Sequence, residues 1–591
     1  MFNIYYRLGV LMAEKNRSEW NSTFGFMMAM IGSAVGLGNI WRFPNVLYSN
    51  GGGSFMIPYI VALFLLGISF VMVEYALGYR FRASVSKILY SINNKLESIG
   101  WLILLIIFFI LTYYVCVIGW DLIYFVLSFT KAWGADPNTF FASNVLQASG
   151  SIDGFLQFVP WVVISVLVVW GVILAITRNH LNSGIEKVSK ILIPLLCAMV
   201  VVIVIFSLTL PGASIGYSQI FTPDWGALAD FDVWLAAFGQ IVFSLSLGMA
   251  IAITYASYLP KGSKLVDSAL TVVVSNSTFE IFNSFGVFSI LGFMALSSGI
   301  AFNELITDGT GLAFVVFPQV FNLMGFWSLI IGPLFFGCIL FAGITSAIAL
   351  VEPISAAITE KFGIKRKNAA TYICIVGFVV SLLFTTQAGS FFLGIFDSFL
   401  NNFALLLTIV IECIIYGWIY NFDKLIETMN EYSTIKLGKT WKLVIKFALP
   451  LCILVFWLSG IKNTILQADF TSQMIMLVLG IILIIAKLTL PGLLVTIVGI
   501  AVVAVTSGGK STDTDIEFQI SERIKDLQEQ SEKHFEVYEK NFLKMLKPVN
   551  LRGYDFIEKE TPFYFKKGSD GMNRTNYFTG MNLIFTNEKR G

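Results

Sequence analysis

Long apolar segments recur along most of the chain, separated by short polar loops. Each is close to the roughly 20 residues that an α-helix needs to cross the hydrocarbon core of a bilayer. The pattern predicts about twelve membrane-spanning helices and therefore an all-α polytopic membrane protein. The predicted spans cover residues 24–48, 54–79, 99–129, 158–177, 188–211, 232–258, 266–298, 327–357, 368–386, 391–420, 441–461 and 471–487.

Glycine and other small residues interrupt the first and the sixth of these spans near their middle. The sequence reads AVGLGN over 34–39 and FSLSLGM over 243–249. Lipid cannot hydrogen-bond to a broken helix, so such backbone persists only where it lines a protected cavity. Freed carbonyls there can bind a cation, and half-helix N-termini can face an anion. Because the two interrupted spans lie five helices apart in opposite orientations, they predict a five-plus-five inverted repeat with a binding site at its interface.

Composition and charge agree with a membrane protein and indicate its surroundings and its orientation. The chain has 591 residues, of which 56% are hydrophobic and 13% charged, with a mean hydropathy of +0.78 and a net charge of +2. The near-neutral charge argues against nucleic acid as a partner, and lipid is the expected surroundings. Lys and Arg cluster in alternate loops, so the positive-inside rule predicts a multi-pass protein of the cell membrane with a cytoplasmic N-terminus. The cysteines lie in apolar segments without metal-type spacing.

The spans divide the chain into predicted parts. These are a cytoplasmic N-terminal segment 1–23, an inverted-repeat core of helices 1 to 10 at 24–420, helices 11 and 12 at 421–487, an additional apolar segment 488–509 and a polar C-terminal tail 510–591. The additional segment is short for a span, so a thirteenth helix, a re-entrant segment and an interfacial helix all remain open. The tail contains no catalytic motif. The side of the membrane on which it lies depends on which of these alternatives holds, and therefore also stays open.

Three runs of sequence carry a family resemblance. They are GSAVGLGNIWRFPNVLYSNGGGSFMIPY at 32–59, GQIVFSLSLGMAIAITYASY at 239–258 and FAGITSAIALVEP at 341–353. The chain resembles the neurotransmitter:sodium symporter family over about residues 16–487, and within it the prokaryotic amino-acid transporters such as the bacterial leucine transporter. The resemblance implies a sodium-coupled secondary transporter, not an enzyme, that imports an amino acid by alternating access.

The resemblance implies two sodium ions and no organic cofactor. The first implied site, which also touches the substrate carboxylate, consists of the Ala34 carbonyl, Asn39, Ser244 and Asn276. The second consists of the carbonyls of Gly32, Val35 and Ala342 with the hydroxyls of Thr345 and Ser346. Sodium is a hard cation, which favours such oxygen ligands. A lone Asn in a membrane helix often bonds a neighbouring helix instead, and adjacent hydroxyls often bond their own helix.

The substrate residues also follow from the resemblance. The implied set is Ala34, Gly36, Leu37, Gly38, Ile110, Tyr114, Phe243, Ser244, Ser246, Met249, Ser346 and Leu350. Monoamine-transporting relatives have an aspartate at the position of Gly36, so glycine here favours a substrate that brings its own carboxylate. The side-chain part of the pocket, bounded by residues such as Ile110, Met249 and Leu350, is apolar and carries no fixed charge. A neutral, apolar amino acid is therefore expected.

Charged residues match the gates of the family. Arg42 and Asp397 match the outer gate, and Arg17 and Glu360, with Tyr258 nearby, match the inner gate. Glu352 stands where the family has a glutamine, which predicts a more acidic inner network. Charged groups within membrane spans are functional by default, whereas an exposed Arg17 or Glu360 is also compatible with an ordinary loop charge.

Glu280 replaces a serine of the chloride-dependent relatives. It follows Asn276 by four residues, so both side chains lie on one helical face. Tyr59, Gln240 and Ser244 match the other positions around the anion, so Glu280 is expected to substitute for chloride, permanently or through a proton. Another intramembrane acid, Asp121, has no family counterpart to which a role can be assigned.

Other functions remain open at this point. A proton-coupled amino-acid transporter on the same fold is the mechanistic alternative, although the retained sodium-ligand types favour sodium. A transporter-like amino-acid sensor that signals through the C-terminal tail is a second alternative, against which the gate residues count. The exact substrate, the ion stoichiometry and the oligomeric state stay open.

Overall fold

The computed structural model describes residues 18–305, 309–466 and 468–485. Within these residues the chain is built from helices, and the only extended pairing is an isolated bridge between Phe158 and Thr386. The additional apolar segment 488–509 and the tail 510–591 lie outside the described residues, as does most of the segment 1–23. The all-α polytopic class predicted from the sequence is confirmed.

The helices follow the predicted spans closely. In the first half they are α2 (Thr23–Ala34), α3 (Phe43–Ser49), α4 (Met56–Ala62), α5 (Ser69–Phe81), α6 (Val85–Ile92), α7 (Glu97–Ser128), α8 (Pro137–Thr139), α9 (Pro160–Thr177), α10 (Lys187–Leu208), α11 (Ala213–Phe221), α12 (Phe231–Ser244) and α13 (Ile251–Ala256). In the second half they are α14 (Leu265–Ser298), α15 (Phe302–Leu305), α16 (Gly309–Gly311), α17 (Phe317–Leu323), α18 (Ser328–Phe362), α19 (Arg366–Ser381), α20 (Gly389–Phe399), α21 (Leu406–Ile414), α22 (Asp423–Asn430), α23 (Lys439–Leu443) and α24 (Leu449–Gly460).

The described residues contain nine helices long and apolar enough to cross a membrane, or ten when a bent pair is counted as one span. That pair is Thr23–Ala34 and Gly38–Ser49, bent by 59°. The shorter apolar helices include Phe231–Ser244, which belongs to the sixth predicted span, and Phe470–Ile485, which belongs to the twelfth. With these two the helices account for every predicted span.

The break in the first span follows from its sequence. Ser22 caps the start of α2, where its hydroxyl accepts the Gly25 N–H at 3.0 Å. The helix ends at Ala34 and resumes at Gly38 with the segment η1 (Gly38–Arg42). Between them the amide oxygen of Asn39 accepts the Gly36 N–H at 3.0 Å, which replaces a bond that the helix no longer provides.

The break in the sixth span depends on left-handed backbone. Ser246, Gly248 and Ala250 have φ angles of 51°, 71° and 56° between the end of α12 and the start of α13. For a residue that is not glycine such a conformation costs about 1–3 kcal/mol and persists only where the surroundings impose it. Contacts elsewhere in the fold must therefore compensate the conformational free energy that this break costs.

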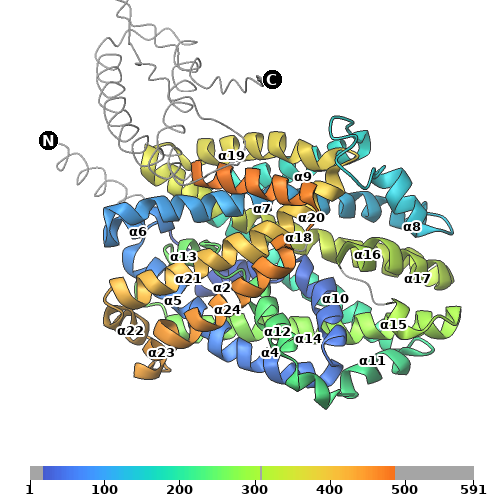
Figure 1. Cartoon of the computed structure of the whole chain (residues 1–591), viewed down its shortest axis with the longest axis horizontal. Helices are drawn as coiled ribbons and strands as arrows, with labels where there is room; N and C mark the ends of the chain where they lie inside the picture. Colours follow the sequence, from blue (N-terminus) through green and yellow to red (C-terminus); the bar gives the residue numbers. More distant parts are fainter. Residues whose placement is uncertain (1–17, 306–308, 467, 486–591) are drawn as a thin grey trace, which may run out of the picture. The chain divides into compact units, whose positions relative to one another are not determined.

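Helix α18 lies at the centre of the bundle, and 89% of its most apolar window is buried, more than in any other candidate span described. It runs antiparallel to α7, because the Gly343 position packs against Ile118 while the Gly337 position packs against Phe125. It also contacts α2 and α10. Figure 1 shows α18 crossing the middle of the helical body, with α6, α22 and α23 at one end and α8, α11, α15 and α17 at the other.

Close packing of α5 against α13 gives a first prediction. A Cβ atom at Gly78 would collide with the backbone carbonyl of Ile253, which cannot move without distorting α13. Gly78→Ala should therefore destabilise the protein by about 3 kcal/mol, the upper end of the usual overpacking cost. Thermal unfolding in detergent measures this, with Gly171→Ala on α9 as the matched control, since nothing lies within 4 Å of its added Cβ. Equal stability of the two variants would contradict the packing.

Candidate functional site

A cavity of about 70 Å3 lies beside the break in the first span. Segments far apart in the sequence supply its walls: the break itself, α7, the break of the sixth span, α18 and α20. Every residue of the predicted substrate set except Ser244 lines it. The cavity also contains residues that the sequence did not assign to the pocket, namely Ser33, Asn39, Tyr113, Ile251 and Asp397. Two of these were predicted in other roles, and Tyr113 is adjacent to the predicted Tyr114.

The polar part of the cavity is built on the break. The Leu37 N–H donates to the Tyr114 hydroxyl at 3.4 Å, and the Ser246 hydroxyl donates to the Ser33 carbonyl at 3.2 Å. A Cβ at Gly36 would lie 3.0 Å from Ser346 Oγ and 3.1 Å from Tyr114 Oη. A larger residue there would therefore fill the space between these two hydroxyls.

The rest of the cavity is apolar. Ile110, Met249 and Leu350 line it, and each is 5% exposed. Gly38 faces the Phe243 ring so closely that an added Cβ would lie 2.6 Å from Cε1. A glycine at this position lets the ring pack directly against the start of η1.

The structure brings the side chains of the first predicted ion site into one cluster. Asn39 Nδ2 donates to Asn276 Oδ1 at 2.8 Å and to Ser244 Oγ at 3.3 Å. Asn276 Nδ2 donates to Ser244 Oγ at 2.6 Å. Ala34, the fourth predicted ligand, lines the neighbouring cavity. Carbonyl, amide and hydroxyl oxygens suit a hard cation. In the structure Asn39 turns its nitrogen toward this cluster, while its oxygen accepts the Gly36 N–H.

Glu280 lies in the same cluster and is fully buried. Its Oε2 accepts the Tyr59 hydroxyl at 2.7 Å, and its Oε1 accepts Asn39 Nδ2 at 3.0 Å and Gln240 Nε2 at 3.1 Å. The Ser244 hydroxyl also donates to Oε1. The positions predicted to surround an anion thus all donate to this carboxyl group.

The residues of the second predicted ion site lie where α18 meets α2. The Ser346 hydroxyl donates across this contact to the Gly32 carbonyl at 3.3 Å. The Thr345 hydroxyl instead donates to carbonyls of its own helix, at 3.0 Å to both Phe341 and Ala342. Val35, one residue past the end of α2, is 1% exposed. The structure therefore places this set together, with one of its two hydroxyls engaged within α18.

The two residues predicted to form the outer gate, Arg42 and Asp397, do not form a direct ion pair in the part of the chain described. The Arg42 guanidinium lies over the Phe243 ring, 4.6 Å from its centroid. Asp397 Oδ1 accepts the Tyr113 hydroxyl at 2.9 Å and Asn401 Nδ2 at 2.8 Å. Sequence reasoning missed the roles of Tyr113 and Asn401 in holding this carboxylate.

Of the residues predicted to form the inner gate, Arg17 lies outside the described residues, so its pairing with Glu360 stays a prediction. Glu360 Oε2 accepts the backbone N–H and the hydroxyl of Ser84 at 2.9 and 2.7 Å. Nearby, the Trp20 indole donates to the Tyr255 carbonyl at 2.8 Å and anchors the chain just before α2.

An ion pair next to Tyr258, a residue of the predicted inner gate, was not predicted. Arg366 Nη2 lies 2.7 Å from Glu352 Oε2, with side-chain exposures of 20% and 1%. Glu352 Oε1 also accepts the Tyr258 hydroxyl at 2.9 Å. The acidic residue that replaces the family's glutamine is therefore neutralised by a cation at the start of α19. The sequence signal was weak, since Arg366 lies in a loop-and-helix run of basic residues.

The two broken spans, the buried cavity between them and the oxygen-rich clusters beside it define a membrane transporter. The match to the family model of the Sodium:neurotransmitter symporter family, over residues 17–139 and 134–502, makes the assignment specific. The chain belongs to this family, and it is a multi-pass membrane protein.

Individual relatives agree with this assignment. An uncharacterized sodium-dependent transporter of Methanocaldococcus jannaschii, MJ1319, is 41% identical over 442 residues, which cover 75% of this chain and 90% of that protein. The sodium- and chloride-dependent creatine transporter 1 of Bos taurus is 28% identical over 473 residues, or 71% of this chain and 73% of the relative. Among solved structures, MhsT in complex with L-phenylalanine matches with a TM-score of 0.64 and 31% identity, covering 75% of this chain and all (100%) of the other.

The inner ion pair gives a second prediction. Arg366→Ala leaves the buried Glu352 without its cation and should cost about 3 kcal/mol, the lower end for a buried pair because Arg366 is partly exposed. Adding Glu352→Gln should restore most of the loss. Thermal unfolding of the single and double variants measures both effects.

The control is Lys361→Ala, which breaks a more exposed pair with Glu97 and should cost less than about 1 kcal/mol. If Glu352→Gln gives no rescue in the Arg366→Ala background, uncompensated charge is not what destabilises that variant.

Proposed function

We propose that the protein imports a neutral, apolar amino acid together with sodium by alternating access, without a need for chloride. The observation that carries this is the position of the cavity, which shares Ala34 and Asn39 with the first ion-ligand cluster. A substrate bound there lies directly beside the ion. The family match, whose relatives include a sodium-dependent transporter, supports the coupling ion.

The substrate carboxylate is proposed to bind at the polar part of the cavity. There the amides of Leu37 and Gly38 begin a new helix, whose N-terminal dipole favours an anion. Tyr114 adds a hydroxyl, which in the structure is 3.4 Å from the Leu37 nitrogen. An aspartate at position 36 would fill the space between Ser346 and Tyr114, whereas glycine leaves it for the carboxylate of the substrate. This favours amino acids over monoamines.

The ammonium group is proposed to face the break of the sixth span. Carbonyls of Ala34, Phe243 and Ser244, with the Ser246 hydroxyl, are available to it because the helix there leaves its own bonds unmade. The substrate side chain then lies against Ile110, Met249 and Leu350. Burial of apolar surface, worth about 25 cal/mol per Å2, supplies affinity. The solved complex of the relative MhsT with L-phenylalanine supports an apolar substrate.

Two sodium ions are proposed as co-transported cargo. The first binds Ala34, Asn39, Ser244 and Asn276 and is completed by the substrate carboxylate, which makes substrate and ion binding interdependent. The second binds Gly32, Val35, Ala342, Thr345 and Ser346 between α2 and α18. To bind this second ion, the Thr345 hydroxyl oxygen directs a lone pair toward the ion while its O–H still donates to a carbonyl of α18. The second ion ties the broken helix to the central one.

Opening and closing at the two ends is proposed to use the charged residues there. Arg42 moves from the Phe243 ring toward Asp397 when the outer side closes. Arg17 and Glu360, beside Tyr258, act at the inner side. The N-terminus is cytoplasmic, residues 24–420 form the moving core and residues 421–487 its support.

Glu280 is proposed to make chloride unnecessary. The creatine transporter 1 of Bos taurus is named as sodium- and chloride-dependent. Here a buried carboxyl group receives hydrogen bonds from Tyr59, Asn39, Gln240 and Ser244. A permanent carboxylate supplies the same negative charge beside the ion.

Uptake into proteoliposomes that contain the full chain tests the proposal. A sodium gradient should drive accumulation of labelled phenylalanine or leucine, and unlabelled Lys, Arg, Asp and Glu should compete weakly. Accumulation that is equal with and without sodium, or strong competition by a monoamine lacking a carboxylate, would contradict it.

Asn39 provides a third prediction. Asn39→Ala removes an oxygen ligand of the first ion and should raise the sodium concentration for half-maximal uptake at least about tenfold, the equivalent of about 1.4 kcal/mol. The control is Asn45→Ala on α3, whose side chain accepts a hydrogen bond from Ser49 at an exposed position. An unchanged sodium requirement in Asn39→Ala would remove this residue from the site.

Chloride dependence provides a fourth prediction. The native protein should transport equally in chloride and in gluconate, since Glu280 supplies the charge. Glu280→Ser should make uptake rise with chloride, because the anion can then occupy the space of the carboxylate. Glu304→Ser, at an exposed acid, serves as the control. A chloride requirement of the native protein would exclude the role of Glu280.

A further inference from the structure

Asp121 is a buried acid outside the substrate and ion sites. It lies on α7, within a candidate membrane span, and is fully buried. Neither of its carboxyl oxygens has a hydrogen-bond partner. The Trp120 indole nitrogen and the Tyr124 hydroxyl, on the same stretch of helix, also have none. Such unpaired groups are costly in a bilayer and therefore indicate a function.

The register of α7 against α18 places Asp121 close to the second ion site. Ile118 packs against the Gly343 position, and Phe125 packs against the Gly337 position. Asp121 lies between these two contacts, at the level of Cys338 on α18. Cys338 precedes Ala342, a proposed ligand of the second ion, by four residues, about one helical turn.

No cation faces Asp121 from the helices described around it. Helix α9 contains no ionisable residue, α18 presents Cys338 at this level, and α10 presents Cys197, which interacts with Cys338. On α7 itself the neighbouring ionisable groups are Cys116 and Tyr124. An unpaired carboxylate in such surroundings costs several kcal/mol, so in this conformation the group is a neutral acid that holds its proton.

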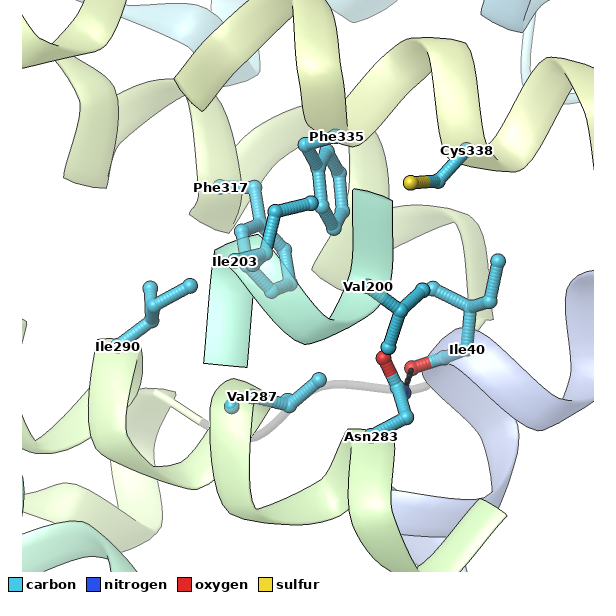
Figure 2. A pocket seen from close by; sticks show the side chains of 10 residues that line it. Ile40, Val200, Ile203, Asn283, Val287, Ile290, Phe317, Phe335 and Cys338 are labelled. Carbon is cyan, nitrogen blue, oxygen red and sulfur yellow. Dashed lines mark hydrogen bonds between the residues drawn. The ribbon is translucent and has the colours of Figure 1, made fainter. Parts of the chain in front are cut away.

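A small cavity borders Cys338, the residue of α18 at the level of Asp121. Its volume is about 10 Å3, close to the minimum for one water molecule. Figure 2 shows Cys338 at one side of this cavity, with Ile40 and Asn283 across from it. Asn283 donates to the carbonyls of Asn39 and Ile40 at 3.2 and 3.0 Å. Cys338 and Ile40, a residue of the broken first span, therefore lie on the wall of the same cavity.

We propose that Asp121 is a proton-binding site that the protein loads and unloads as the broken first span moves. When water reaches the group, its O–H bond breaks, the proton passes to water and a carboxylate remains; the return step reverses this transfer. A metal ion fits less well, because the described residues contain no group of three or more His, Cys, Asp or Glu side chains that could hold one.

Infrared difference spectroscopy of the full chain in membranes tests the site directly. Spectra are compared in potassium and in sodium buffer, because the proposed sodium sites predict that this exchange shifts the conformational equilibrium. The native protein should then show bands of protonated carboxyl groups that change. Asp121→Asn should lose one of these bands. Glu280→Gln should lose a different one or none, and Asp153→Asn, at an exposed acid, should retain all of them.

Transport gives a second readout, which rests on the function proposed above. Sodium-driven phenylalanine uptake should depend on pH in the native protein, and Asp121→Asn, which is always neutral, should lose part of that dependence. Asp121→Glu should keep it. If the chain moves no amino acid although it binds sodium, the proposed transport function fails while the infrared experiment still decides about Asp121.

Two results would overturn the proposal. One is an Asp121→Asn protein with the infrared bands and the pH profile of the native protein, which would mean that Asp121 never exchanges its proton. The other is an Asp121→Asn protein that does not fold while Asp121→Glu does, because a neutral acid should tolerate its neutral isostere.

Discussion

A bilayer provides no hydrogen bonds to a broken helix, and the arrangement of this protein depends on that constraint. Backbone groups at the break of the first span are hydrogen-bonded by other groups of the protein itself. Asn39 binds the freed Gly36 N–H at 3.0 Å, Asn283 donates to the carbonyls of Asn39 and Ile40, and the Ser246 hydroxyl donates to the Ser33 carbonyl. The two breaks are thus held against each other and against α14, and the cavity lies where their remaining polar groups converge.

Electrostatics in this centre depends on a few buried groups. Glu280 is surrounded by hydroxyl and amide donors, and two of them, Asn39 and Ser244, also belong to the first ion cluster. The carboxyl group therefore lies directly beside the place where a cation is proposed to bind. Arg42 packs on the Phe243 ring and is separate from Asp397, which Tyr113 and Asn401 hold. In the conformation described, Arg42 and Asp397, the charged residues of the predicted outer gate, thus contact neutral partners. They are not paired with each other.

The sequence was sufficient for the spans and for both breaks, because glycines and small residues are conspicuous in apolar helices. The cluster of Asn39, Ser244, Asn276 and Glu280 followed only from the family resemblance. The sequence was insufficient for contacts that depend on how each helix is oriented about its own axis relative to its neighbours. The pair of Arg366 with Glu352 and the bonds from Tyr113 to Asp397 connect different helices and leave no local pattern. The rotation and tilt of a membrane helix are set by packing and are not encoded in its apolar length.

The central claim is that the substrate carboxylate belongs to the first sodium site, and equilibrium sodium binding tests it most directly. Sodium affinity of the purified protein is measured alone, with phenylalanine and with phenethylamine, which has the same side chain and no carboxylate. Because coupling between ligands is reciprocal, phenylalanine should increase the sodium affinity several-fold while phenethylamine should not. Equal sodium affinity under all three conditions, or an equal increase with both compounds, would contradict the account.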